Sequence, residues 1–322
     1  MPHRLANLLA AALVLTWCSG ARADTYPSRP ITIVLGIAAG GITDVTTRLY
    51  AEAASRHLGQ RVIIENRTGA GGAIAATGVQ NATPDGYTLL AFLGSQHAAV
   101  PAMQNAPYDP VKGLAPITLL FNLVTFIAVP AESPATSMQE LLDLGKTKQG
   151  GLLFGSPGQG TPSHLLAAKI GLATKIPMQF IHYRGGNPMM ADLITARVDF
   201  ALPTYTVAKS YIDGKKLRVL AIDAERRWDT MRDVPTLSEV GLGNEKVASW
   251  FGLAAPAGTP DDIVQKVRDA FVRASQEPEL MQRLADNGTP IVTSSPAEMA
   301  RKMEEEAANM ARLAKQIGQM TN

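Results

Sequence analysis

Short apolar runs alternate with longer amphipathic segments along almost the whole chain. Three early runs have the length and composition of strands: ITIVLG (31–36), RVIIEN (61–66) and YTLLAFL (87–93). Between the first two, residues 43–59 place Val45, Leu49 and Ala53 four positions apart, which is the spacing of one helix face, and Gly59 is a typical C-terminal stop. This alternation predicts an α/β fold whose sheets are mostly parallel and flanked by helices.

A break in the alternation predicts two lobes. Two strand-like runs, 115–121 and 125–130, are separated by only the three residues NLV. A second αβ series follows, with expected helices at 137–148, 163–173, 187–195 and 205–213 and expected strands in GLLFGS, MQFIHY, VDFAL and LRVLAI. The run SWFGLAAPAGTP (249–260) then predicts one more strand that leads into a helix.

We therefore expect the chain to cross between the lobes twice, near 122–126 and near 246–252. Lobe 1 is then discontinuous, with residues 24–123 and 251–322, and lobe 2 comprises residues 124–250. A hinge and a ligand-binding cleft between the lobes follow from this layout. The last helix carries an apolar face at helical spacing, which we interpret as core packing: Met299, Met303, Met310, Leu313 and Ile317.

The first 23 residues predict a cleaved signal peptide and an exported, periplasmic protein. Arg4 is followed by a short apolar stretch and by the small residues of ARA (21–23), so we expect cleavage before Asp24. Cys18 follows Trp17, where a lipid-anchor motif requires a small residue, so lipidation is not expected. Cys18 is the only cysteine of the 322 residues, and its removal leaves no disulfide or thiol chemistry.

Composition and charge exclude several classes of function. The net charge is +2, and removal of Arg4 and Arg22 with the leader reduces it to zero, which argues against nucleic-acid binding. Four histidines remain after residue 23, and none lies three or four positions from another, so no local metal motif exists. No G-x-S-x-G motif is present. We predict no metal, no cofactor and no catalytic residue.

Three glycine-rich turns resemble nucleotide-binding motifs but lack essential residues. Residues 36–43 read G-x-x-x-x-G-x-T, with Ile42 where a P-loop has the lysine that contacts the phosphates. GAGGAI (69–74) has Ile74, and GQGTPS (158–163) has Ser163, at the third glycine position of a dinucleotide fingerprint. Each turn still leads into a helix, whose first N–H groups can hold a carboxylate without a lysine. The alternative is that these glycines only form tight turns.

Seven segments together resemble one family, the Bug-type extracytoplasmic receptors of tripartite tricarboxylate transporters. They are ENRTGAGG (65–72), PDGYTLL (84–90), PYDPVKGLAPIT (107–118), GQGTPSHL (158–165), YRGGNP with ADLITARVDF (183–200), DVPTLSEVG (233–241) and SWFGLAAPAGTP (249–260). The resemblance implies a periplasmic two-lobe protein of the Venus-flytrap, type II-like fold. It also implies a protein without enzymatic activity that binds a small carboxylate and delivers it to membrane permease subunits. We expect this protein to be a monomer.

Carried over by position, the resemblance implies a ligand site formed by loops of both lobes. In lobe 1 these are Gly40, Gly41, Thr43 and Asp44, followed by Ser95, Gln96 and His97. In lobe 2 they are Ser156, Gly158, Gly160, Thr161 and Ser163, with Tyr183, Gly185, Thr204 and Tyr205 on the far wall. Asp44 can instead serve its own helix dipole, His164 can be a packed residue, and Arg184 can be solvated.

Two departures from the family pattern affect the expected ligand. The first loop has Ile37, Ala38 and Ala39 where relatives carry an aromatic residue and prolines, which makes this wall smaller and more apolar. The stretch after Asp199 reads FALPTYT and lacks the acid that would meet an amino group, so a carboxylate without an amino group is expected. Two other functions remain open: a ligand sensor for signalling, and an exported hydrolase or isomerase that uses His97 or His164.

Overall fold

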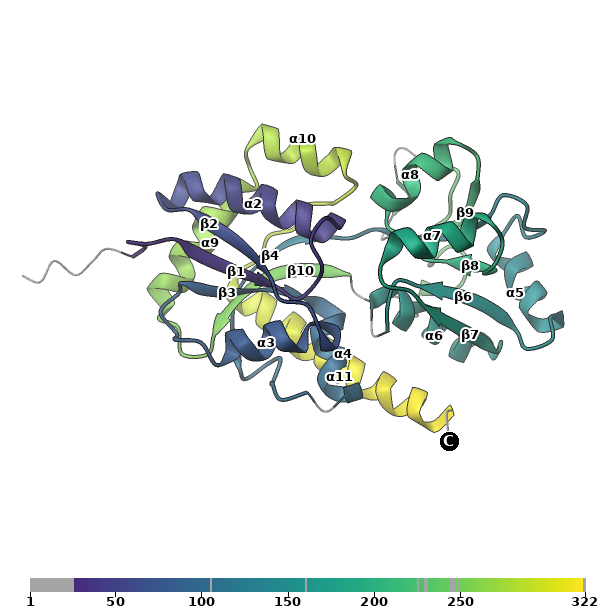
Figure 1. Ribbon diagram of the computed structural model, residues 1–322, viewed down its shortest axis with the longest axis horizontal. Helices are drawn as coiled ribbons and strands as arrows, with labels where there is room; N and C mark the ends of the chain where they lie inside the picture. The colour runs from purple at the N-terminus through teal and green to yellow at the C-terminus, as the bar shows by residue number, and fades with distance from the viewer. Residues whose placement is uncertain are drawn as a thin grey trace, which may run out of the picture.

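A computed structural model describes residues 26–104, 106–159, 161–224, 226–228, 231–243, 247 and 249–320. The predicted signal peptide and its cleavage site before Asp24 lie outside these residues, as does Gly160. The chain forms two αβ lobes that lie next to each other (Figure 1). The first lobe is defined here by the sheet that contains the N-terminal strands, and the second by the sheet that contains the middle strands.

The sheet of the first lobe has the order β2-β1-β3-β10-β4. Its strands are β1 (Ile31–Leu35), β2 (Val62–Asn66), β3 (Thr88–Leu93), β4 (Leu114–Asn122) and β10 (Trp250–Pro256). β1 pairs in parallel with β2 and β3, whereas β10 is antiparallel to both β3 and β4. Four strands therefore run one way, and the strand that returns from the second lobe runs against them.

The second sheet repeats this plan in the order β7-β6-β8-β5-β9. Its strands are β5 (Thr125–Pro130), β6 (Leu152–Ser156), β7 (Met178–His182), β8 (Phe200–Ala201) and β9 (Leu217–Asp223). β6 is parallel to β7 and β8, and β5 is antiparallel to β8 and β9. The odd strand is again the first one after a crossing between lobes. The predicted α/β fold with two lobes is confirmed, although each sheet is mixed because of this strand.

Helices cover both faces of each sheet (Figure 1). The first lobe has α2 (Ile42–Leu58), a short 3-10 turn η1 (Ala70–Gly72), α3 (Ala73–Gln80), α4 (Gly94–Gln104), α9 (Asp261–Ala274), α10 (Pro278–Asp286) and α11 (Pro296–Met320). The second has α5 (Met138–Thr147), α6 (Pro162–Thr174), α7 (Gly186–Ile194) and α8 (Tyr205–Asp213). As predicted, α2 ends at Gly59, which has a left-handed φ of 69°. On its expected apolar face Leu49 and Ala53 are buried, but Val45 is exposed.

The apolar face of α11 packs against both lobes. Met299 and Met303 are buried in the first lobe, in a cluster with Phe92 and Trp250. Met310 and Leu313 belong instead to a cluster with α6 residues of the second lobe, such as Leu166 and Ile170. Core packing is thus confirmed for these four residues, and the side chain of Ile317 lies outside the described part of the structure. The C-terminal helix therefore links the two lobes on one side.

Candidate functional site

The first loop of the predicted site joins β1 to α2. α2 starts after Gly41 with no side-chain cap, so the N–H groups of its first turn have no partner within the helix. Gly40 has a φ of 88°, which a residue with a side chain rarely adopts. Gly41 has an ordinary φ of −78°, and a Cβ added to it would meet no atom within 4 Å. The uncapped N–H donors of the first turn thus follow the exposed Gly40 and Gly41, although Thr43 and Asp44 of this turn are buried.

Asp44 is buried and holds this loop in place. Its Oδ2 accepts hydrogen bonds from the Gly40 N–H at 3.0 Å and from Arg48 Nε at 3.1 Å. Its Oδ1 accepts from Arg48 Nη2 at 3.0 Å and from Asn66 Nδ2 at 2.9 Å. Burial alone would raise the pKa of Asp44, but the hydrogen bonds from Arg48, Gly40 and Asn66 hold it below its ordinary value. Both oxygens therefore serve the loop itself, and ligand contact by Asp44 stays a prediction.

The second predicted element, Ser95 to His97, is buried at the start of α4. Gln96 Nε2 donates to the Gly71 carbonyl at 2.9 Å, and His97 Nδ1 accepts from the Leu93 N–H at 2.9 Å. Burial lowers the pKa of His97 to about 4, so the ring is neutral at physiological pH and carries its proton on Nε2. Ser95 Oγ and His97 Nε2 have no hydrogen-bond partner among the described residues.

The turn at residues 69–72 belongs to the same group of loops, and the sequence analysis left it out of the site. Gly69, Gly71 and Gly72 all have left-handed φ values, of 129°, 62° and 92°. A Cβ on Gly36 would approach the Cα of Gly72 to 2.9 Å, and a Cβ on Gly72 would approach His97 Nε2 to 2.9 Å. The loops after β1, β2 and β3 therefore meet at this point, and only glycines permit the approach.

In the second lobe, the loop after β6 is held by its own hydroxyls. Ser156 Oγ donates to the Gly158 carbonyl at 2.8 Å, and Thr161 Oγ1 donates to the same carbonyl at 2.7 Å. Thr161 Oγ1 also accepts from the His164 N–H at 3.4 Å and so caps α6. Ser163 Oγ donates to the Leu202 carbonyl at 2.9 Å and is buried. Ser156, Gly158, Thr161 and Ser163 are thus brought together as predicted, although their hydroxyls already have partners.

Tyr183 and Gly185 lie beside this loop. The Tyr183 N–H donates to the Ser156 carbonyl at 2.8 Å, and the Gly185 N–H donates to the Pro157 carbonyl at 3.0 Å. Gly185 precedes α7, which like α2 begins without a side-chain cap. The Tyr183 hydroxyl donates to Asp192 Oδ2 at 2.7 Å, and partial burial together with this carboxylate raises the pKa of Tyr183 to about 12.

Thr204 and Tyr205 begin α8, and Tyr205 takes part in a contact between the lobes. Its ring meets the ring of Trp228 edge-on, with centroids 4.7 Å apart. Both rings lie against Gly288 of the first lobe, where an added Cβ would come within 3 Å of each. Thr206 Oγ1 also donates to the Asn287 carbonyl at 3.0 Å. Tyr205 therefore packs between the lobes in this structure, and its role as a ligand wall stays a prediction.

These loops share one position in the fold. Each follows the carboxyl end of a strand and precedes a helix, which is where ligands bind in open α/β sheets. Figure 1 shows the start of α2 on the side of the first lobe that faces the second lobe, and the start of α7 on the facing side of the second. His164 is buried 4.8 Å from the His182 ring, and burial together with His182 lowers the pKa of His164 to about 4. This histidine is neutral and packed.

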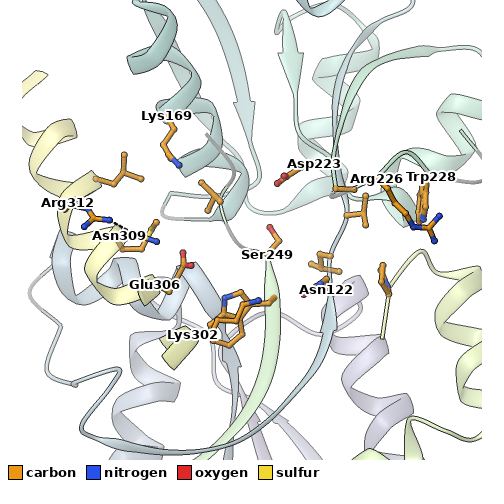
Figure 2. Close-up of a pocket in the computed structure, with 18 of the residues that line it drawn as sticks. Asn122, Lys169, Asp223, Arg226, Trp228, Ser249, Lys302, Glu306, Asn309 and Arg312 are labelled. Atoms are coloured by element: carbon orange, nitrogen blue, oxygen red, sulfur yellow. Dashed lines mark hydrogen bonds between the residues drawn. The ribbon is translucent and has the colours of Figure 1, made fainter. Parts of the chain in front are cut away.

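A cavity of about 990 Å³ lies elsewhere between the lobes, beside the two crossing segments. It is lined by residues of the crossings, such as Asn122 and Ser249, and by α11 residues, such as Lys302 and Glu306 (Figure 2). None of the predicted site residues lines it. We call it the hinge cavity, and it is distinct from the group of glycine loops.

No group of three or more histidine, cysteine, aspartate or glutamate side chains within the described residues could hold a metal ion. Within the same part of the chain, no helix is long and apolar enough to span a membrane.

The chain is similar to known receptors over nearly its whole length. Residues 46–319 match the family described as "Tripartite tricarboxylate transporter family receptor". A Cupriavidus necator protein, described as "UPF0065 protein in gbd 5′ region", is 40% identical over 265 residues, which cover 82% of this chain and 80% of that protein.

Two solved structures share the fold of this chain and are also similar to it in sequence. The periplasmic binding protein BugD superposes with a TM-score of 0.80 at 30% identity. The match covers 91% of this chain and 99% of the BugD chain. MatC of Rhodopseudomonas palustris, solved with bound malate, superposes with a TM-score of 0.80 at 30% identity. The match covers 90% of this chain and the whole of the MatC chain. The family is one of receptors rather than enzymes, so the hydrolase and isomerase readings lose their support. The chain therefore belongs to the tripartite tricarboxylate transporter receptor family.

Proposed function

We propose that the protein is a periplasmic receptor that captures a small carboxylate between its lobes and delivers it to the permease of a tripartite transporter. One observation carries this proposal: α2 and α7 each begin after a glycine with no side-chain cap, on facing sides of the two lobes. The N–H groups of a helix's first turn carry partial positive charge and bind oxygen anions. Two such starts suit a ligand with one carboxylate for each lobe.

The loops also favour a particular type of carboxylate. Ala38 and Ala39 are exposed beside Gly40 and offer an apolar surface. Arg48, which follows this loop on α2, is already bound to Asp44, so we infer that N–H groups rather than this arginine would hold the ligand. The FALPTYT stretch offers no acid for an amino group. We infer an aliphatic or aromatic acid without an amino group, and the malate bound in MatC is a relative's ligand of this type.

The predicted signal peptide and the similarity to BugD support a periplasmic location, and the family description supports a permease partner. The predicted monomer also remains part of this proposal. A receptor of this kind would bind its ligand in the cleft, close around it and present the closed form to the permease.

A thermal-shift screen tests the carboxylate class. The panel contains succinate, malate, adipate and benzoate, each beside its amide, with aspartate as the amino-acid control. A ligand that binds only the folded protein stabilises it by RT ln(1 + [L]/Kd), about 2.7 kcal/mol at a hundredfold excess over Kd. We expect at least one acid to raise the melting temperature by several degrees while its amide does not. Equal shifts from acid and amide, or no shift from any acid, would contradict the proposal.

A further inference from the structure

The hinge cavity has the composition of a binding site in its own right. Figure 2 shows Lys169 of α6 and Glu306 and Asn309 of α11 pointing toward the same space, with Ser249 to one side of it. α11 continues from the core of the first lobe, whereas α6 belongs to the second. A molecule in this cavity would therefore contact both lobes at once.

Trp250 supplies an unused donor at the wall of this cavity. The side chain is 1% exposed, and its indole N–H has no hydrogen-bond partner among the described residues. The ring is fixed because it stacks on Phe92 with centroids 5.4 Å apart and covers Gly94, where an added Cβ would meet it at 2.7 Å. A buried donor without a partner is costly, and these contacts hold the ring, so its acceptor has to come from Glu306 or from a molecule in the cavity. An acceptor placed in the cavity would remove this cost.

The charges around the indole favour an anionic acceptor. Lys302 Nζ lies 5.7 Å from the centroid of the Trp250 ring. Among the described lining residues, four are lysine or arginine and two, Asp223 and Glu306, are acids. Glu306 is only 6% exposed, and the indole N–H is near it without reaching hydrogen-bond geometry.

The surroundings of Glu306 change its protonation state near neutral pH. Burial and, to a smaller extent, Glu305 raise its pKa, while Lys302, Lys169 and the Trp250 N–H oppose the rise, and the net value is about 7. Part of the Glu306 population is therefore protonated near neutral pH, which leaves the lining more positive. Arg312, Asp223 and Arg226 are the other charged residues that line the cavity.

We propose that the hinge cavity is a second ligand site, which takes a small di- or tricarboxylate between Trp250 Nε1 and Lys302. An apolar wall of Val124, Met310 and Leu313 would contact the carbon body of the ligand, which an inorganic anion lacks. Because the cavity touches both lobes, its occupant changes the angle between them and so couples to ligand capture at the glycine loops. This site does not depend on the function proposed above.

Tryptophan fluorescence can follow this site alone. The chain has three tryptophans, Trp17 in the leader and Trp228 and Trp250 at the cavity. In the full chain with Trp17→Phe and Trp228→Phe, Trp250 is the sole tryptophan. Titration with citrate should change its emission with a saturable profile, because the indole N–H gains a partner. An emission that stays constant up to saturating citrate would overturn the proposal.

Three variants on this background separate the hinge cavity from the glycine loops. Lys302→Met should weaken citrate binding about tenfold, the scale expected for losing one unit charge a few Å away in a partly buried site. Glu306→Gln should tighten binding at pH 8, where wild-type Glu306 is mostly ionised, and change it little at pH 6. A gain in affinity cannot arise from misfolding. Gly41→Asp, which alters only the first glycine loop, should retain a saturable change in emission, because the responding indole lies in the hinge cavity.

The opposite pattern would assign the signal to closure of the cleft. If Gly41→Asp abolishes the emission change while Lys302→Met and Glu306→Gln leave it intact, citrate acts at the glycine loops and the hinge-cavity site is wrong. An equal effect of Glu306→Gln at pH 6 and pH 8 would likewise contradict a role for its ionised carboxylate.

Discussion

A negative charge at residue 41 should weaken carboxylate binding without harming the fold. Gly41 is the N-cap of α2, with a φ of −78° and a ψ of 165°, and an added Cβ meets no atom within 4 Å. Aspartate and asparagine are among the best N-cap residues, so either replacement should leave folding stability equal or a few tenths of a kcal/mol higher. Gly41→Asn is therefore the matched control for Gly41→Asp, because it has nearly the same shape and capping ability but no charge.

The size of the effect follows from the exposure of the loop. An N-cap side chain lies beside the first-turn N–H groups that we propose as ligand donors, so its charge would stand about 4–5 Å from the ligand carboxylate. At that range the repulsion is about 1 kcal/mol in water and about 4 kcal/mol at the effective dielectric of a protein surface. Because Gly40 and Gly41 are exposed, we expect a value near the lower end, about 1–2 kcal/mol. This corresponds to about 5- to 30-fold weaker binding than in Gly41→Asn.

Isothermal titration calorimetry measures this ratio with the acid that gives the largest thermal shift. Raising the ionic strength should reduce the ratio between the two variants, because salt screens an exposed charge. The asparagine variant alone can lose some affinity, since its side chain competes for the same N–H groups. If both variants bind the acid with the same affinity at low salt, the first turn of α2 is not the carboxylate site.

Two further predictions concern the buried side of the first lobe. The free energy of unfolding should fall as the pH drops from about 6.5 toward 4, because His97 takes up a proton in the unfolded chain but stays neutral when it is buried in the folded protein. For this histidine the fall is at most about 1.4 kcal/mol per pH unit. Urea denaturation between pH 4 and 7 should therefore give a shallower slope for His97→Gln, and an unchanged slope would refute the assignment. Gly72→Ala should cost about 1–3 kcal/mol, because it forces a side chain into a φ of 92° and against His97. Gly41→Ala, measured in the same assay, should stay within about 0.5 kcal/mol of wild type, and equal losses in both variants would contradict this reading.

Local patterns predicted the elements of the fold well because each carries its own signal. The spacing of Leu49 and Ala53 and the stop at Gly59 gave α2, whose C-cap has the expected left-handed backbone. The methionine face of the last helix is buried as predicted. Strand direction depends on where the chain re-enters a sheet, so the antiparallel setting of β5 and β10 had no local signal.

The candidate site was harder to predict because its contacts are mostly non-local. The pairing of Asp44 with Arg48 could have been foreseen, since the two residues are four positions apart on a helix. The approach of Gly36 and Gly72 joins loops from different strands, and only the run of glycines hinted at it. The sequence suggests Tyr205 as an aromatic wall of the ligand site, but it could not show that Tyr205 contacts Trp228 and Gly288, which come from distant segments.

The most direct test of carboxylate capture is a crystal structure with the acid selected by the thermal-shift screen. The account predicts carboxylate oxygens within hydrogen-bond distance of the first-turn N–H groups of α2, and a second contact from the start of α7 across the cleft. An acid that binds to one lobe only, or that occupies the hinge cavity and leaves both helix starts to water, would contradict it.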